Sequence, residues 1–330
     1  MTRRDPPSAD DNAIDTSNAA RERNRRDGVN EACGSETALD VGGPQLTWRE
    51  GRRQPMLHIE PVANRGPALD TVRGSMPGDD GMRVDVPYAA RFDDTYFSLD
   101  DGRAETRAVF IDGNRLVERF RSGDALHIAE LGFGTGLNFF ETVRVFAEHG
   151  ASTATLTYTS FEQFPLRIED MRRTLAGWPD TLAAADDWLA AWPEGLGVID
   201  GQQRSARDVE VCDDQSADDM MVVRRGPVTL RLVLGDARTR ITRDIFSSPV
   251  DAWFLDGFSP AKNPELWSHE LMAHVFAHTA PGGTFSTYTA AGFVRRGLEA
   301  AGFLVDRVPG FARKRERLQG MRPRAPDAAA

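Results

Sequence analysis

The chain has 330 residues, 40% of them hydrophobic, so it can bury a sizeable core in one large or two modest domains. Its net charge of −10 argues against a nucleic-acid partner held by overall charge alone. No apolar run approaches the ~20 residues of a membrane span, the first residues lack a secretory signal, and two distant cysteines suggest no disulfide frame. We therefore expect a soluble, cytoplasmic protein.

The first part of the chain is predicted to be irregular. Residues 1–44 are polar and aperiodic, which is typical of a disordered leader. Residues 45–122 are predicted to form a small N-terminal β region, with an inserted loop rich in Pro, Gly and Asp at 57–86. Within this region, 108–120 indicates two strands around an Asp-Gly-Asn turn, a β-hairpin.

From residue 123 to 320, strand and helix patterns alternate, which favours a doubly wound parallel sheet. The expected strands are 125–131, 153–161, 228–234, 251–255, 283–288 and 303–308. The expected helices are 138–148, 167–192, 238–245, 265–278 and 292–301. The polar stretch at 196–225 is predicted to be an insertion or long connection, and 321–330 a disordered tail.

A glycine-rich turn follows the first strand of this alternation, in the sequence Glu130-Leu-Gly132-Phe-Gly134-Thr-Gly136. Such glycines let the backbone approach a ligand closely and open a helix N-terminus. The acidic residue before the first glycine suits a cationic sulfonium, whereas it would repel a pyrophosphate. The turn therefore favours S-adenosylmethionine over a nicotinamide dinucleotide.

Three further strands also end at carboxylates, Glu162, Asp236 and Asp256. Glu162 can accept hydrogen bonds from ribose hydroxyls, and Asp236 can accept one from an adenine amino group. Each acid alone is equally compatible with a structural role, but four in chain order predict a class I S-adenosylmethionine-dependent methyltransferase with a Rossmann-like sheet. We expect the cofactor to be bound by Glu130, Gly132, Gly134, Thr135, Gly136, Asn138, Glu162, Gln163, Asp236 and Ala237.

The strand that ends at Asp256 opens into the loop Gly-Phe-Ser-Pro-Ala-Lys-Asn-Pro. Ligands of open α/β sheets bind beyond the carboxyl ends of the strands, so Asp256 is the candidate catalytic residue. The two prolines restrict the backbone on either side of Lys262 and Asn263. Lys262 and Lys314 are the only lysines among 40 basic residues, which favours a specific role for Lys262.

The C-terminal part of the chain is basic. Residues 291–324 carry nine basic and three acidic side chains, and the alternative to a binding role is a solvated helix and tail. His274 and His278 are four residues apart but lack the Glu of a His-Glu-x-x-His motif, so no metal is predicted.

Several segments together resemble one family, the tRNA 5-methylaminomethyl-2-thiouridine methyltransferases (MnmC/MnmD type). The matching segments are Arg91–Ser98, Glu105–Arg107, Gly113–Leu116, Glu130–Phe139, Ser160–Pro165, Trp253–Trp267, Gly282–Thr284, Tyr288–Gly297 and Gly310–Glu316. The resemblance implies methyl transfer to the aminomethyl group of the wobble uridine of certain tRNAs. Asp256 would orient this amine and take its proton, although the ordinary pKa of an aspartate favours orientation.

The resemblance also implies contacts to the tRNA. Tyr96 and Phe258 can stack on the uracil or simply pack, and Lys262 and Asn263 can touch the nucleotide or fix their loop. The candidates for phosphate contacts are Arg295, Arg296, Arg313, Lys314 and Arg315.

Many members of the family carry a flavin-dependent oxidase domain after the methyltransferase. Because this sequence stops at Ala330, we expect no FAD in this chain and a separate enzyme that supplies the amine. Two alternatives stay open: a small-molecule amine N-methyltransferase on the same fold, and a non-catalytic tRNA-binding protein with a vestigial cofactor pocket.

Overall fold

The structure, a computed structural model, describes residues 58–61, 85–89, 91–98, 100–192, 198–199, 202–203, 220–241 and 245–324. All of them belong to the second of the two units into which the chain divides, Asp40–Ala330. The predicted leader at 1–44, most of the predicted loop at 57–86, much of the 196–225 connection and the last six residues lie outside the described part.

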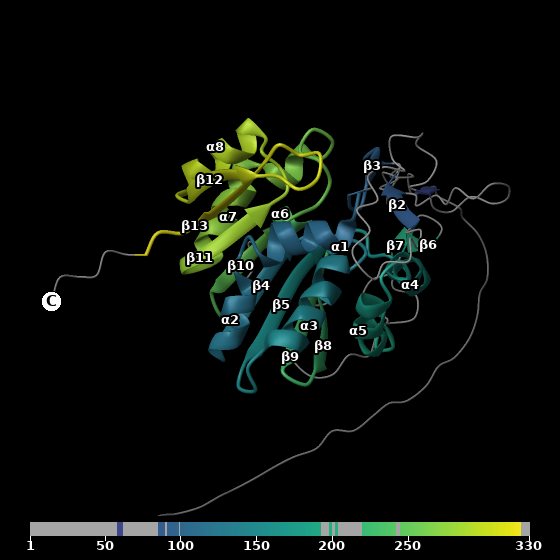
Figure 1. Ribbon diagram of the computed structural model, residues 1–330. Helices are drawn as coiled ribbons and strands as arrows, with labels where there is room; N and C mark the ends of the chain where they lie inside the picture. Colours follow the sequence, from purple (N-terminus) through teal and green to yellow (C-terminus); the bar gives the residue numbers. More distant parts are fainter. Residues whose placement is uncertain are drawn as a thin grey trace, which may run out of the picture. The chain divides into compact units, whose positions relative to one another are not determined.

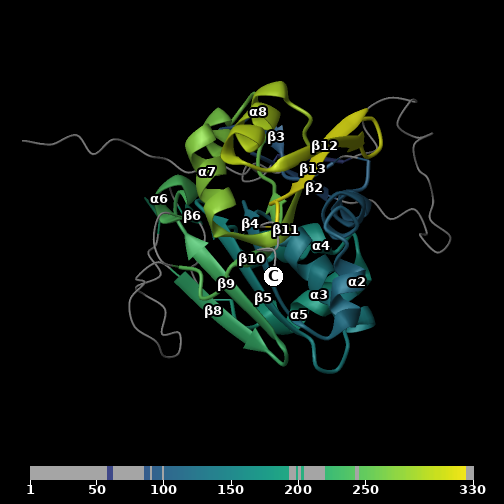
Figure 2. The same ribbon diagram turned by 90° about the vertical axis from the view of Figure 1, so that its left-hand side faces the viewer.

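A mixed eight-stranded sheet forms the centre of the described unit (Figures 1 and 2). In spatial order its strands are β12 (Leu304–Pro309), β13 (Glu316–Met321), β11 (Thr279–Thr287), β10 (Val250–Leu255), β4 (Ala125–Leu131), β5 (Thr155–Glu162), β9 (Val228–Leu234) and β8 (Met220–Arg225). The five strands from β11 to β9 are parallel, and antiparallel strands flank them on both sides. The predicted α/β class with a doubly wound sheet is confirmed.

The register of the parallel strands brings their carboxyl ends level with one another. Leu255 pairs with Leu131, Leu131 with Phe161, and Phe161 with Val233. The residues that follow these positions therefore lie at one edge of the sheet, and the strand-end carboxylates are brought to the same edge.

Helices cover both faces of the sheet because buried side chains alternate along its strands. Phe254 packs in one core cluster with Phe139 and Trp188, whereas its neighbour Trp253 packs in the other with Leu271 and Leu298. The first face is covered by α2 (Leu116–Ser122), α3 (Leu137–His149) and α5 (Pro179–Leu189), and the second by α6 (Ala237–Arg240), α7 (His269–His278) and α8 (Gly292–Ala301) (Figure 2).

The predicted β-hairpin at 108–120 is wrong. These residues lie in a π-helical turn, η2 (Thr106–Ile111), and in α2. Asn114 is fully buried rather than exposed in a hairpin turn, and its Nδ2 donates to the carbonyl oxygens of Phe110 (3.0 Å) and Trp253 (3.3 Å). A short apolar run fits a buried helix as well as a strand, so its pattern alone does not separate the two.

Several other elements differ from the prediction in their length or continuity. The helix expected at 167–192 is split into α4 (Ile168–Leu175) and α5, because Pro179 has no backbone N–H to continue a helix and instead begins a new one. The helix expected at 265–278 consists of a 3₁₀ turn, η4 (Pro264–Trp267), followed by α7 with Ser268 as its N-cap. The described helix within 238–245 is only the four-residue α6. Strand β13 was not predicted, because only Leu318 of its six residues is buried.

The N-terminal β region is a three-stranded antiparallel sheet of β1 (His58–Pro61), β2 (Asp85–Ala89) and β3 (Asp94–Thr95), followed by α1 (Gly102–Glu105). Strand β2 contacts α4, and segment 91–98 thereby reaches the carboxyl edge of the large sheet. A short pair, β6 (Val198–Ile199) and β7 (Gln202–Gln203), lies within the predicted connection at 196–225. The end of that stretch is not a connection but strand β8 of the large sheet, which pairs with β9. The proposed boundary near residue 123 stays a prediction.

Candidate active site

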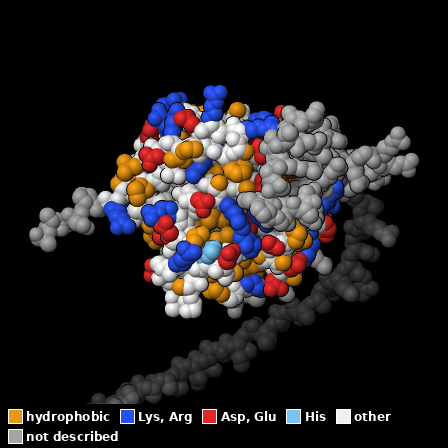
Figure 3. Space-filling view, in the orientation of Figure 1, with side chains coloured by type: hydrophobic (Ala, Val, Ile, Leu, Met, Phe, Trp, Pro, Cys, Tyr) orange, Lys and Arg blue, Asp and Glu red, His pale blue; other side chains and the backbone are white. Residues whose placement is uncertain are grey.

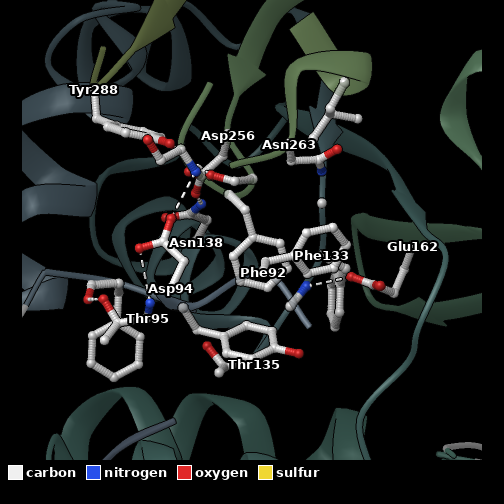
Figure 4. Close-up of a pocket in the computed structure, with 18 of the residues that line it drawn as sticks. Phe92, Asp94, Thr95, Phe133, Thr135, Asn138, Glu162, Asp256, Asn263 and Tyr288 are labelled. Carbon is white, nitrogen blue, oxygen red and sulfur yellow. Dashed lines mark hydrogen bonds between the residues drawn. The ribbon is translucent and has the colours of Figure 1, made fainter. Parts of the chain in front are cut away.

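A cavity of about 810 Å³ opens at the carboxyl ends of β4, β5, β9 and β10 (Figure 4). Its inner wall consists of the turns that follow these strands, and its outer wall consists of segment 91–98, the loop after Asp256, and Arg313 and Lys314. The cavity therefore lies where the sequence analysis placed the ligand.

The glycine-rich turn forms a close backbone wall. Gly132, Gly134 and Gly136 have φ angles of +84°, +53° and +76°, which L side chains rarely adopt. A Cβ atom on Gly134 would lie 3.0 Å from the ring of Tyr96, and one on Gly136 would lie 2.5 Å from the ring of Phe140. Gly132, Gly134 and the adjacent Thr135 line the cavity, whereas Gly136 begins α3 behind it.

Glu162 binds the glycine-rich turn to the end of β5. Its Oε2 accepts a hydrogen bond from the backbone N–H of Gly134 (2.7 Å), and its Oε1 accepts one from Phe164 (2.6 Å). Burial raises the pKa of this carboxyl, although the backbone N–H groups oppose the shift. Glu162 and Gln163 both line the cavity.

Asp236 and Ala237 line the cavity after β9. The Asp236 carboxylate caps α6 by accepting from the backbone N–H of Arg238 (2.9 Å), and it also pairs with the Arg238 side chain (2.9 Å). Partial burial acts to raise the pKa of Asp236, but the hydrogen bonds from Arg238 outweigh it and lower the pKa. The Asp236 carboxylate is thus already paired with the Arg238 side chain.

Asp256 is joined to Glu130 through Asn138. The Asn138 Nδ2 donates to Asp256 Oδ2 (2.7 Å), and both residues are labelled in Figure 4. The same Nδ2 donates to Glu130 Oε1 (2.9 Å), while Asn138 Oδ1 accepts from the Thr106 hydroxyl (2.6 Å). Ser160 donates to the other oxygen of Glu130 (2.8 Å). One amide therefore sets the position of both carboxyl groups.

Both carboxyl groups have strongly raised pKa values. Burial raises the pKa of Asp256 to about 7 and that of Glu130 to about 8, and in each case the hydrogen bond from Asn138 opposes the shift. Asp256 faces the cavity, whereas Glu130 is fully buried behind Asn138 and does not line it. The sequence alone indicated an ordinary pKa for Asp256. The burial that raises this pKa results from tertiary packing, which no local sequence pattern reveals.

Aromatic rings form one side of the cavity. Phe258, two residues after Asp256, stacks on Phe92 with ring centroids 4.4 Å apart, and Tyr96 contacts it edge-on at 5.2 Å. Tyr96 and Phe258 thus pack against each other and also line the cavity. Their positions are compatible both with stacking on the uracil and with a purely structural packing role.

Lys262 connects the loop after Asp256 to the N-terminal segment. Its Nζ donates to the backbone oxygen of Asp93 and lies 3.5 Å from the Asp93 carboxylate. The backbone N–H of Ser259 donates to Asp94 Oδ2 (2.8 Å), which joins the same two segments. Lys262 therefore fixes the loop in the free protein, and Asn263 lines the cavity beside it.

The five candidate phosphate-binding residues do not share one location. Arg313 and Lys314 line the cavity, whereas Arg295, Arg296 and Arg315 do not. Arg295 pairs with Glu299 on α8 (3.3 Å), and Arg296 and Arg315 are exposed.

Several lining residues were not assigned a role from the sequence: Phe92, Asp94, Glu105, Thr106 and Tyr288. They come from the N-terminal segment and from beyond β11, and no spacing in the sequence relates them to the glycine-rich turn. The only sequence signal for a role of these five residues was that they lie within segments that resemble the family.

The described residues contain no cluster of three or more His, Cys, Asp or Glu side chains arranged to hold a metal ion. Within the same residues, every helix is too short or too polar to cross a bilayer.

Comparison with known proteins agrees with the fold. A family model described as S-adenosyl-L-methionine-dependent methyltransferase matches residues 212–323. The bifunctional tRNA 5-methylaminomethyl-2-thiouridine biosynthesis protein MnmC of Chromohalobacter salexigens is 45% identical over 246 residues, which are 74% of this chain and 32% of that protein. MnmC of Pseudomonas fluorescens is 43% identical over 237 residues, 71% of this chain and 33% of that protein.

The chain thus spans about a third of the length of these curated relatives. Among solved structures, MnmC2 from Aquifex aeolicus superposes with a TM-score of 0.55 at 22% identity, covering 74% of this chain and 69% of that one. This likeness supports the fold.

Proposed function

We propose that the protein is an S-adenosyl-L-methionine-dependent methyltransferase that methylates the amine of 5-aminomethyl-(2-thio)uridine at the wobble position of tRNA. The match of residues 212–323 to a model of such methyltransferases and the similarity to the MnmC proteins support this proposal. The observation that carries this proposal is that one cavity brings together the Asp256 carboxyl, the glycine-rich turn, Arg313 and Lys314. Burial raises the pKa of Asp256 to about 7, and this value suits proton transfer near neutral pH.

The cavity fits S-adenosylmethionine. Gly132 and Gly134 have positive φ angles and expose backbone to the cavity, and acidic side chains at the ends of β5 and β9 suit the hydroxyl and amino groups of adenosine. The residues proposed to hold the cofactor are Gly132, Gly134, Thr135, Glu162, Gln163, Asp236 and Ala237. When bound, the cofactor supplies an electrophilic methyl group on a sulfonium.

Asp256 would act on the acceptor amine. An alkylamine resembles a lysine side chain, with a pKa of ~10.4, so it arrives protonated and has to lose a proton before it can attack. A carboxylate with a raised pKa is a stronger base than an ordinary aspartate. Asn138 holds Oδ2 of Asp256 in place, which orients the carboxylate toward the cavity, and we assign Asn138 and Glu130 as positioning residues rather than direct cofactor ligands.

The tRNA would bind across the rim of the cavity. Arg313 at the rim and the exposed Arg315 beside it are the best-placed residues for phosphates, and Arg295 and Arg296 on α8 would extend the contact. The exposed edges of Tyr96 and Phe258 would contact the base.

A separate amine-forming oxidase, a cytoplasmic location and the absence of FAD from this chain stay predictions. The MnmC relatives are described as bifunctional, and this supports an oxidase as the other partner in the modification. Absorbance spectra of the purified protein between 350 and 500 nm test for a bound flavin.

The direct test is incubation of the protein with labelled S-adenosylmethionine and tRNA from cells that lack this methylation, followed by nucleoside analysis. We expect label in 5-methylaminomethyl-2-thiouridine. Label in free amines alone would favour a small-molecule N-methyltransferase, and tRNA binding without any transfer would favour a non-catalytic tRNA-binding protein.

A further inference from the structure

Only two of the chain's 40 basic residues are lysines, and both line the cavity. Lys262 holds the N-terminal segment, as described above. The ammonium of Lys314 has a different environment, since it lies 2.6 Å from Glu105 Oε1 and 4.1 Å from the centroid of the Tyr288 ring. An ammonium between a carboxylate and an aromatic face is the arrangement by which proteins bind alkylammonium ligands.

Glu105 and Tyr288 are held in place by contacts that do not involve Lys314. Glu105 Oε2 accepts from the backbone N–H of Ser98 (3.2 Å), and the Tyr288 hydroxyl donates to the carbonyl oxygen of Gly257 (2.8 Å). The Glu105 side chain is only 10% exposed, whereas that of Lys314 is 41% exposed. Two fixed groups thus hold the end of a long, flexible side chain that can swing toward solvent.

These groups border the proposed catalytic carboxylate. Gly257, which accepts from Tyr288, directly follows Asp256 in the chain. Among the charges that act on the pKa of Asp256, Glu105 raises it and Lys314 lowers it. The ammonium of Lys314 therefore lies in the same part of the cavity where an acceptor amine would have to meet Asp256.

We propose that Glu105 and the ring of Tyr288 form a binding subsite for the ammonium of the acceptor, and that the ammonium of Lys314 occupies this subsite until the acceptor arrives. This inference rests on the proposed function. A carboxylate as buried as Glu105 is costly to leave without a cationic partner. An acceptor that carries an ammonium can replace Lys314, whereas an unmodified uridine has no charge to do so, and the exchange thereby selects uridines that carry the amine.

Calorimetry with the full chain tests this subsite at pH 8 in the presence of S-adenosylhomocysteine, which prevents methyl transfer. The probes are the nucleoside 5-aminomethyluridine and, for comparison, uridine. Lys314→Met removes the competing ammonium and should tighten binding of 5-aminomethyluridine about fivefold while leaving uridine unchanged. Glu105→Gln should weaken binding of 5-aminomethyluridine about tenfold and also leave uridine unchanged.

Arg307→Met is the matched control, because it removes an exposed cation that pairs with Glu316, and neither of these residues lines the cavity. It should change neither affinity. Circular dichroism checks the fold of each variant, and if Glu105→Gln does not fold, the Lys314→Met comparison decides alone.

The subsite is overturned if Lys314→Met leaves the affinity for 5-aminomethyluridine unchanged, or weakens binding of both nucleosides alike. Methyl transfer to tRNA by the wild-type protein is measured separately. If the protein binds the nucleosides as expected but methylates no tRNA, the proposed subsite stands and the proposed tRNA substrate is wrong. If the protein methylates tRNA but fails the nucleoside comparison, only the proposed subsite is wrong.

Discussion

The inner end of the cavity and its rim are held by different kinds of interaction. At the inner end, the buried Asn138 joins the buried carboxyl group of Glu130 to the carboxyl group of Asp256, which faces the cavity. At the rim, the ammonium groups of Lys262 and Lys314 form ion pairs while their side chains are 38% and 41% exposed. Buried polar networks resist rearrangement, whereas a partly exposed lysine on a flexible stem can leave its partner for solvent. The inner end thus keeps the reacting groups in fixed positions, whereas the rim can exchange one cation for another when a substrate binds.

The largest expected effect comes from removing the base at the inner end. Asp256→Asn should lower kcat by roughly 10²–10⁴-fold, because proton transfer by a positioned group contributes about that much. Cofactor affinity, measured by calorimetry, should change little. Asp306→Asn, an exposed acid on β12, is the matched control and should retain full turnover. Wild-type turnover in Asp256→Asn would remove this residue from the mechanism.

The next test alters the position of that base without removing it. In the wild type, kcat/KM should rise with pH around the Asp256 pKa of about 7, since the carboxylate is the active form. The hydrogen bond from Asn138 lowers this pKa, so Asn138→Ala should move the rise to higher pH and reduce kcat by about tenfold or more. A rise that stays at the wild-type pH would mean that Asn138 does not set the protonation of Asp256.

Glu162 tests whether the inner end also binds the cofactor. Glu162→Ala should weaken S-adenosylmethionine binding about tenfold or more, because it removes both a ligand acceptor and the acceptor for Gly134 N–H. Isothermal calorimetry measures the change. Glu169→Ala, an exposed acid on α4, is the control. Equal affinity in both variants would exclude Glu162 from the proposed role with the ribose.

The smallest expected effect belongs to the rim. Replacing both Arg313 and Arg315 by Gln should weaken tRNA binding several-fold and lower the slope of log K against log salt by about 1 per lost phosphate contact. Filter binding between 50 and 200 mM salt measures this slope. If the slope is unchanged, the basic end of the chain is a solvated surface, and the rim does not contact the phosphates there.

The same contrast explains what the sequence could predict. Glu162 is the last residue of β5, and Asp236 and Asp256 come just after β9 and β10, so local pattern and the level register of parallel strands were sufficient to place them at one edge. The rim depends on contacts between distant segments, as shown by Lys314 and Glu105, which are 209 positions apart. No periodicity encodes such a contact.

Two features that the sequence pattern did not reveal have physical causes of the same kind. Residues 108–120 were expected to form a hairpin, yet the buried Asn114 binds the backbone of Trp253 on β10, and this tertiary contact overrides the local turn pattern. Glu130 was expected to bind the cofactor, which stays a prediction, but its side chain is fully buried behind Asn138 and shares its strand face with the core residue Ile128. The raised pKa values of Glu130 and Asp256 likewise depend on burial that strand spacing does not reveal.

Strand β13 lies between β11 and β12, although it follows both of them in the chain. Until its six residues are available, β11 and β12 each present an unpaired edge, and such edges invite association with other chains. Synthesis proceeds from the N-terminus, so Lys314, two residues before β13, emerges only when the sheet is about to close. We therefore expect completion of the rim and closure of the sheet to occur together late in folding, and a chain that ends before Lys314 to have neither.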